Sequence, residues 1–339
     1  MFRGIARSTS MRDISLRGLL SSSLLGACIL HSPLAVAQSF PSRAVTLVVP
    51  FSPGTGIDLL ARTLGPKLAD RWNVPVVVDN KSGASGNIGS EQVMHATPDG
   101  HNLLVTATSF ATNVAINSAA GGLRYDPVKS FAPIAVLATG TLTVVVASKV
   151  PANSLAEFIA LAKRQPGALH YASSGNGTPQ HLAMELFKLE AGLNMIHVPY
   201  KGNAGAYADL VGGHVDAMVS PIHTAAPYVA GGKLRMLGVL GAERTPLFPN
   251  VPTLKESGFP KLDMEVWYAM FAPRATPADT VNRINTDVNV LLSSNEIREA
   301  LVKQGLVAAG GRPQRLADLV ALELARWPQV VAKAGIRAD

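Results

Sequence analysis

Two glycine-rich turns decide the fold: PFSPGTGID at residues 50–58 and SSGNGTPQH at residues 173–181. Each follows an apolar, β-prone run, VTLVV before the first and ALHYA before the second, and each opens into a sequence with helical spacing. A strand that turns through glycine into a helix directs several backbone N–H groups and the positive end of the helix dipole to one point. Each turn by itself could be an ordinary strand-to-helix connection. Together they predict two domains that face one anionic ligand.

Neither turn matches a nucleotide-binding motif. The third glycine of a dinucleotide site, which allows close packing of helix on strand, is replaced by Leu59 in the first turn and by Gln180 in the second. The phosphate-binding sequence GxxxxGK[ST] occurs nowhere in the chain. We therefore expect no phosphate cofactor, and the sequence indicates no other cofactor.

The first 37 residues have the pattern of a cleaved export signal. Four arginines precede the apolar run LLSSSLLGACIL at 19–30, and Ala35-Val36-Ala37 has the small-x-small form of a signal-peptidase site. Translation could begin at Met1 or at Met11. In a competing interpretation LGAC at 25–28 is a lipoprotein signal that anchors the chain at Cys28. Cleavage after Ala37 is favoured because it directly precedes the first strand, and we predict a periplasmic protein.

Composition narrows the classes of function. Cys28 is the only cysteine, so a chain cleaved after Ala37 can have neither disulfides nor thiolate chemistry. The formal net charge is +7, and the leader holds four arginines and one aspartate, which leaves +4 on the rest. Without lysine and arginine runs, this weak positive charge makes nucleic acid a poor partner. No later segment supplies the roughly 18 uninterrupted apolar residues that a membrane span requires.

Strand and helix patterns alternate after residue 43. VPVVVD at 74–79 has the β-branched composition of a strand buried on both faces, and IDLLARTL at 57–64 has helical apolar spacing. This order predicts an α/β fold in which each domain is a mainly parallel sheet flanked by helices. Pro66 is expected to kink or break the first helix.

Two long β-rich stretches are candidates for crossings between the domains. The stretch 131–148 is too long for one simple strand, and 263–273 is the natural return. We expect hinges near 138–144 and 262–268. An aromatic residue of Trp267-Tyr268 on the return could close over a ligand, and packing in the core is the alternative.

The chain lacks a convincing metal-binding set. His181 and Glu185 share one helix face, but no third ligand is indicated. His181 is expected to make a capping or packing contact in the first turn of its helix. His197 and His214 lie in apolar surroundings and are expected to be core residues in strands.

No nucleophile motif such as GxSxG is present either. An exported hydrolase is an alternative in which Ser85 or Ser174 would be the nucleophile and His181 its base. No acid that would orient His181 can be placed from the sequence. We therefore predict a binding protein and not an enzyme.

Polar residues end three further predicted strands: Ser109, Tyr200-Lys201 and Ser220. If the strand order places them beside the two turns, N–H and hydroxyl donors line the cleft. Each hydrogen bond to a charged group contributes about 1.5–3 kcal/mol. Three bonds to each of two carboxylates therefore exceed the ~8 kcal/mol of micromolar binding without an arginine clamp.

Seven segments resemble, in the same order, the periplasmic solute receptors of tripartite tricarboxylate transporters, often called the Bug family. They are VTLVVPFSPGTGIDLLAR, VVVDNKSGASGNIG, ATPDGHNLL, YDPVKSFAPIAVLA, YASSGNGTPQHLAMELF, VPYKGNAGAYADLVGGHVDAM and WYAMFAPRATP. The resemblance implies a two-lobed periplasmic binding protein fold of the type II-like Venus flytrap form. It also implies a small organic carboxylate as ligand and membrane transporter subunits as partners.

The resemblance implies ligand contacts in both lobes. Those of the first lobe correspond to Ser52, Gly54, Thr55, Gly56, Asp58 and the Ser109 region. Those of the second correspond to Ser173, Ser174, Gly175, Asn176, Gly177, Thr178, Tyr200 and Lys201. The chain departs from the family pattern at Thr55, where a second glycine is common, and in SPIHTAAP at 220–227, which lacks a further acidic or amide residue near Ser220.

We expect residues 1–37 to be the signal peptide, 38–140 with 266–339 to form lobe 1, and 141–265 to form an inserted lobe 2. A monomer is expected. Delivery of the ligand to a transporter is the leading hypothesis. A receptor that signals to a membrane sensor is the alternative that the sequence leaves open.

Overall fold

Strand and helix alternate along most of the part of the chain that the computed structural model describes, residues 40–118, 121–200 and 202–336, and α9 (Asn295–Lys303) follows α8 (Ala278–Ser293) directly. Residues 40–339 form one compact unit. The predicted export signal and its cleavage site lie outside the described residues, as does Lys201. No helix within the described ranges combines the length and the apolar composition that a membrane crossing needs.

The elements follow the predicted order closely. The first part of the chain forms β1 (Val45–Val49), α1 (Gly56–Trp72), β2 (Val76–Asn80), η1 (Ala84–Gly86), α2 (Asn87–Met94), β3 (Asn102–Ala107), α3 (Ser109–Asn117) and β4 (Phe131–Ala147). The middle forms α4 (Leu155–Arg164), β5 (His170–Ser173), α5 (Pro179–Ala191), β6 (Ile196–Pro199), α6 (Asn203–Gly212), β7 (Ala217–Pro221), α7 (Ile222–Ala230), β8 (Leu234–Val239) and η3 (Pro260–Leu262). The last part forms β9 (Glu265–Pro273), α8 (Ala278–Ser293), α9 (Asn295–Lys303), β10 (Val307–Ala308) and α10 (Pro313–Ala334).

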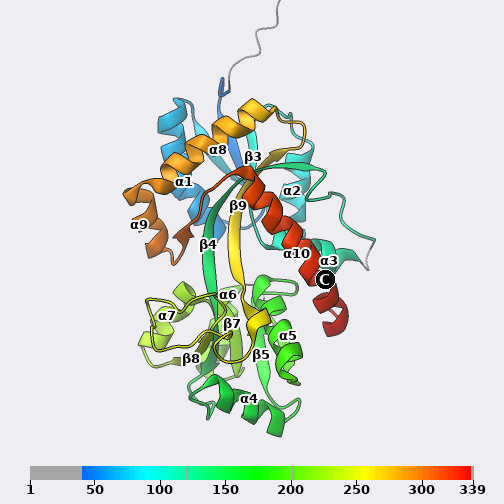
Figure 1. The fold of residues 1–339 in the computed structure, drawn as a ribbon, viewed down its shortest axis with the longest axis vertical. Helices are drawn as coiled ribbons and strands as arrows, with labels where there is room; N and C mark the ends of the chain where they lie inside the picture. Colours follow the sequence, from blue (N-terminus) through cyan, green and yellow to red (C-terminus); the bar gives the residue numbers. More distant parts are fainter. Residues whose placement is uncertain (1–39, 119–120, 201, 337–339) are drawn as a thin grey trace, which may run out of the picture. The chain divides into compact units, whose positions relative to one another are not determined.

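Strand β4 is shared by two sheets, which lie at its two ends in Figure 1. Phe131–Thr141 pairs with β9 in sheet A, whose strand order is β2-β1-β3-β9-β4, with β10 also on β4. Leu142–Ala147 pairs with β7 and β8 in sheet B, which continues from β4 through β7 and β5 to β6. We call sheet A with α1, α2, α3, α8 and α9 the sheet A half, and sheet B with α4 to α7 the sheet B half.

The long stretch that contains β4 forms a single strand of 17 residues, with register shifts after Pro133 and Val136 against β9 and after Val144 against β8. It passes from sheet A into sheet B, and β9 lies antiparallel beside its first part. Both sheets are consequently mixed. β1 pairs parallel with β2 and β3, and β5 pairs parallel with β6 and β7, whereas every pairing of β4 and β9 is antiparallel. The prediction of mainly parallel sheets therefore holds only for the strand–helix–strand units.

Helix starts were predictable from their caps. At the start of α5 the Thr178 hydroxyl accepts the His181 N–H at 3.4 Å, and Pro179 takes the first helical position. The prediction that Pro66 breaks the first helix is wrong, because α1 continues through it to Trp72. Pro66 lacks one backbone N–H, but Leu64 and Leu68 on either side are buried in the sheet A core, and this packing holds the helix together.

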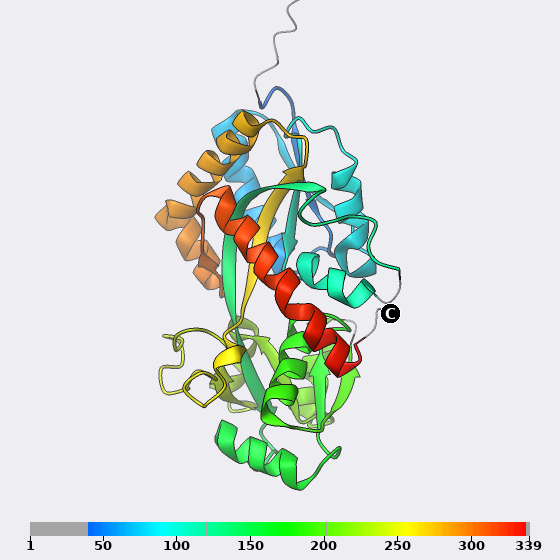
Figure 2. The same cartoon turned by 45° about the vertical axis from the view of Figure 1, so that its right-hand side comes forward.

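Helix α10 packs against both halves. Its first turns bury Leu316 and Val320 in a cluster with residues of β3, β9 and α3. Further on, Trp327, Val330 and Val331 belong to the core cluster of the sheet B half. Figures 1 and 2 both show this helix running past α3 toward α5, so it spans the two halves on one side of the molecule.

Candidate functional site

A cavity of about 480 Å³ lies between the two halves. The sheet A half and the adjoining strand β9 contribute Phe51, Thr55, Gly56, Ile57, Ser85, Ala107, Ser109, Val266 and Tyr268. The sheet B half contributes Ser174, Gly175, Asn176, Gly177, Thr178, Pro179, Gln180, Tyr200, Gly202, Asn203 and Pro221. The two glycine turns thus face one cavity. Among the described residues, its lining contains no charged side chain.

Four helix N-termini meet at this cavity. The first residues of α1, α3, α5 and α6 (Gly56, Ser109, Pro179 and Asn203) are all in its lining. Each N-terminus carries unpaired N–H groups and about half a positive elementary charge. The cavity therefore has a positive potential that comes from oriented backbone dipoles and not from lysine or arginine in the described lining.

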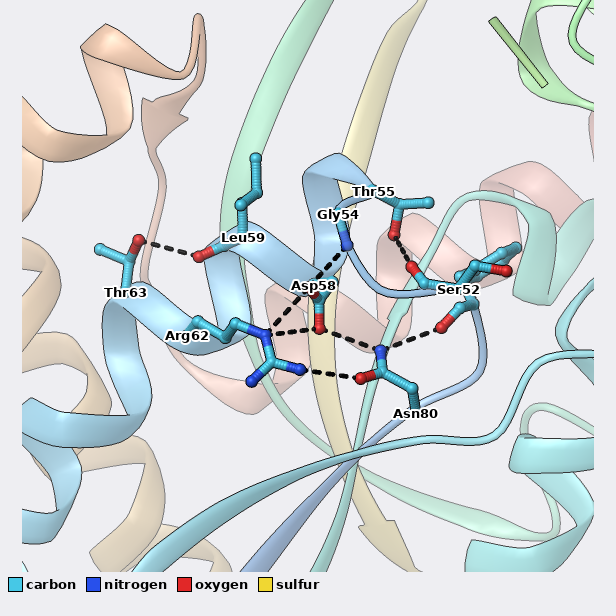
Figure 3. A network of polar contacts seen from close by, with 9 residues as sticks. Ser52, Gly54, Thr55, Asp58, Leu59, Arg62, Thr63 and Asn80 are labelled. Carbon is cyan, nitrogen blue, oxygen red and sulfur yellow. Dashed lines mark hydrogen bonds and ion pairs between the residues drawn. The ribbon is translucent and has the colours of Figure 1, made fainter. Parts of the chain in front are cut away.

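The first turn is held from inside by Asp58 (Figure 3). This carboxylate is 1% exposed and accepts hydrogen bonds from the Gly54 N–H at 2.8 Å, from Arg62 at 3.0 Å and from Asn80 at 2.9 Å. Burial alone would raise the pKa of Asp58, but the bonds from Arg62, Gly54 and Asn80 outweigh burial and lower the pKa. Asp58 is thus an ionised anchor of the turn and lies outside the cavity lining.

The anchoring decides which N–H groups of the first turn can serve a ligand. Asp58 takes the Gly54 N–H, and the Ser52 carbonyl accepts the N–H and hydroxyl of Thr55 at 3.4 and 2.9 Å. The next two N–H groups, of Gly56 and Ile57, donate to no group in the described part of the chain. Both residues line the cavity, so the available donors lie two and three residues after Gly54, at the start of α1.

The second turn is held in the same way by buried side chains. The Ser173 hydroxyl is buried, accepts the Gly175 N–H at 3.2 Å and pairs with Nε2 of His197 at 2.7 Å. Nδ1 of His181 accepts the Gly177 N–H at 3.0 Å. The rings of His181 and His197 stack with centroids 3.9 Å apart. Ser173 and the two histidines therefore hold the turn in place without lining the cavity themselves. The cavity lining is formed by Ser174 and by residues 175–178.

These contacts bear on the alternative roles of His181. The predicted capping or packing contact in the first helical turn is confirmed by the hydrogen bond from the Gly177 N–H and by the stacking of His181 on His197. Glu185, the other candidate metal ligand, accepts from Lys188 at 2.6 Å and from the Tyr171 hydroxyl. In the described ranges, no three His, Cys, Asp or Glu side chains are grouped so that they could hold a metal ion. The His197 imidazole does pair with a serine, Ser173.

Four hydroxyl groups of the lining make no hydrogen bond with any described residue. They belong to Ser85, Ser109, Ser174 and Tyr268. The Tyr268 hydroxyl points toward the start of α1, since a Cβ built on Gly56 would lie 3.6 Å from it. Burial raises the pKa of Tyr268 to about 12, so it is a donor at neutral pH. Free donors therefore come from both halves, next to the helix N-termini.

Not all of the remaining predicted residues lie where the sequence suggested. Ser220 is buried below the cavity, where its hydroxyl pairs with Tyr207. Ser52 lies outside the lining and serves the first turn through its carbonyl. Tyr200 does line the cavity, and it donates its hydroxyl to Asp209. His214, predicted to be a core residue of a strand, is exposed and precedes β7, so that prediction is wrong.

Sequence reasoning missed the apolar wall of the cavity and the α6 N-terminus. Phe51 and Val266 were not considered, because an apolar residue beside a turn or in a strand carries no sign of facing a ligand. Asn203 could have been found, since it follows a strand and a glycine as the two recognised turns do. On β9, Trp267 is buried in the core and Tyr268 lines the cavity, because neighbouring strand residues point to opposite faces.

The chain is similar to known proteins over most of its length. Residues 60–336 match the family described as tripartite tricarboxylate transporter family receptor. Three solved structures are similar over nearly their whole length. R. palustris Rpa4515 with adipate is 34% identical, with a TM-score of 0.78, over 88% of this chain and 99% of that one. MatC from Rhodopseudomonas palustris with bound malate is 32% identical, with a TM-score of 0.76, over 86% and 100%. Periplasmic binding protein BugD is 30% identical, with a TM-score of 0.76, over 88% and 99%.

Proposed function

The chain belongs to the receptor family of tripartite tricarboxylate transporters, and on that premise we propose that its cavity captures a small organic carboxylate for delivery to a membrane transporter. It is a periplasmic solute-binding receptor with the α/β periplasmic binding protein fold. Its family is one of receptors and not of enzymes. The similar structures with adipate and malate support a carboxylate as the ligand of this chain.

The observation that carries the proposal is the meeting of four helix N-termini at a cavity without charged side chains in its described lining. Such a site favours an anion through oriented N–H groups, and the unpartnered hydroxyls of Ser109, Ser174 and Tyr268 add neutral donors. Each hydrogen bond to a carboxylate contributes about 1.5–3 kcal/mol. Six such bonds, about 9–18 kcal/mol in total, leave a surplus over the ~8 kcal/mol of micromolar binding that can offset desolvation and ordering.

We also propose that the ligand is enclosed by movement of two lobes, residues 38–140 with 266–339 and residues 141–265. The hinges are the segments near 138–144 and 262–268, where β4 leaves sheet A and the chain returns to it. Donors for one ligand come from both lobes, so a bound ligand favours the closed arrangement. We propose as well that residues 1–37 are a signal peptide, which is cleaved after Ala37 when the protein is exported to the periplasm.

A thermal-shift screen of mono-, di- and tricarboxylates, aromatic acids and acidic amino acids tests this function. An acid at 100 times its Kd stabilises the folded protein by about 2.7 kcal/mol. Ser174→Ala should lower the affinity for that acid, whereas Ser257→Ala should leave the affinity unchanged, because Ser257 lies outside the cavity. A shift with a sugar or a cation and with no organic acid would contradict the proposal.

A further inference from the structure

The two halves also touch outside the cavity, where α7 meets the loop that follows α9. Gly305 in this loop has φ +69°, and a Cβ built on it would lie 1.7 Å from Cβ of His223 in α7. Real Cβ atoms do not approach other carbons so closely. The contact therefore exists only because residue 305 is glycine, and it brings a backbone directly against the His223 side chain.

Each side of this contact is fixed to a different half. Gln304 donates to the Thr63 hydroxyl of α1 at 2.8 Å, and Leu306 is buried in the sheet A core. Val307, next along, pairs with Thr139 in the sheet A part of β4. In contrast, α7 follows β7 and packs against β7 and β8 in the sheet B half. If the halves move apart, His223 and Gly305 must separate.

The His223 ring is poorly suited to a positive charge in this position. Its Nδ1 is buried and has no hydrogen-bond partner among the described residues. Burial lowers the pKa of His223, and the Gly305 backbone opposes that shift only in part. The ionisable side chains of the adjoining elements are Tyr228 on α7, Arg235 on β8, and Glu296, Arg298, Glu299 and Lys303 on α9. Arg235 donates to the Val150 and Ala152 carbonyls. Of the two acids, Glu296 pairs with Lys67 and Glu299 is exposed, and neither forms an ion pair with His223 in the described chain.

We propose that His223 is a positioning residue for ligand capture, whose neutral imidazole completes the contact that holds the two halves closed and whose protonation favours their opening. The inference rests on the closure proposed above. A ligand held by both lobes is then bound less tightly in acidic surroundings, although His223 is not in the cavity lining.

The direction follows from linkage between protonation and opening. In the open form His223 is exposed to water and has an ordinary pKa near 6.5, whereas the closed form lowers that pKa. The preference for the closed form is therefore complete above about pH 6.5 and declines as the pH falls through the interval between the two pKa values.

A ligand-free distance measurement tests this directly. Spin labels at the exposed positions Lys129 and Lys163, one in each half, report the separation of the halves when Cys28 is replaced by serine. We expect a short distance at pH 8 and growth of a longer-distance population at pH 5. His223→Gln should abolish that growth, while the control His214→Gln, at an exposed histidine, should leave it intact. Identical pH responses of the native protein and His223→Gln would overturn the inference.

A second pair of variants tests the contact without changing pH. Gly305→Ala should populate the longer distance at pH 8, because its Cβ cannot coexist with that of His223. Gly258→Ala is the matched control, since Gly258 also has positive φ but meets nothing within 4 Å. Adding His223→Gly to Gly305→Ala removes this clash together with the imidazole contact, so it should shorten the distance relative to Gly305→Ala without restoring the native value. No effect of Gly305→Ala on the distance would refute the closing contact. Because no ligand is present, these outcomes are independent of the carboxylate screen.

Discussion

Gly177→Ala should destabilise the protein for two separable reasons. Gly177 has φ +71°, and an L-residue in this conformation costs about 1–2 kcal/mol. Its new Cβ would also lie 2.5 Å from Cδ1 of Ile116, at the end of α3. Ile116 is buried in the core of the sheet B half, and forced overpacking of this kind costs about 1–3 kcal/mol. The free energy of unfolding should therefore fall by about 2–5 kcal/mol.

Urea denaturation measures this decrease in the free energy of unfolding, and two further variants separate its conformational part from its steric part. Gly192→Ala has the same backbone conformation, φ +64°, with nothing within 4 Å of its Cβ, so it reports the conformational cost alone. In the double variant with Ile116→Ala, the new Cβ has room. The two changes should therefore be coupled by about 1–3 kcal/mol. If Gly177→Ala is no worse than Gly192→Ala and adds independently to Ile116→Ala, the steric argument is wrong.

The remaining predictions concern the donors and the buried acids. Tyr268→Phe should lower the affinity for the ligand found in the screen by about 10- to 150-fold, which corresponds to the loss of one hydrogen bond to a charged group. The same variant should leave the midpoint of urea denaturation unchanged. Asp287→Ala should cost about 1–3 kcal/mol, because the buried Trp72 Nε1 loses its acceptor, whereas Arg71 and Arg283 are partly exposed and can be hydrated. Glu256→Ala should cost less, because Glu256 and its partner Arg244 are both exposed. Burial would raise the pKa of Asp287, but its hydrogen-bond partners outweigh burial and lower the pKa. The stability that ionised Asp287 contributes is therefore complete above the ordinary pKa of 3.8 and is lost as the pH falls through the lowered pKa. Urea titrations at decreasing pH should show a smaller loss of unfolding free energy for Asp287→Ala than for the native protein.

Local signals in the sequence determined the helix starts and the two turns. Thr178 with Pro179 begins α5. At the start of α4 the Ser154 hydroxyl accepts the Glu157 N–H, and the Glu157 carboxylate accepts the Asn153 N–H. These contacts join residues at most four positions apart, so they depend little on the rest of the fold. The alternation of strand and helix was readable for the same reason.

Residues of the candidate site could be predicted only in part. The glycine turns were placed at strand ends, where α/β folds bind ligands, and both line one cavity. The sequence did not show that Asp58 points inward, because that orientation depends on Asn80, which lies 22 residues away on β2. It also could not show that Ser173 supports its turn through His197, which belongs to the neighbouring strand.

Tertiary structure alone decided how the strands share their partners and which residues meet across the halves. β4 was read as a crossing, but its pairing with β9 at one end and with β7 and β8 at the other depends on strands more than 70 residues later. The contacts of Gly177 with Ile116 and of Gly305 with His223 follow from that arrangement. A sequence pattern reports which groups a residue can offer and the conformation it favours nearby. Which groups meet across 60 or more residues is set by the packing of whole sheets and helices, which no local pattern contains.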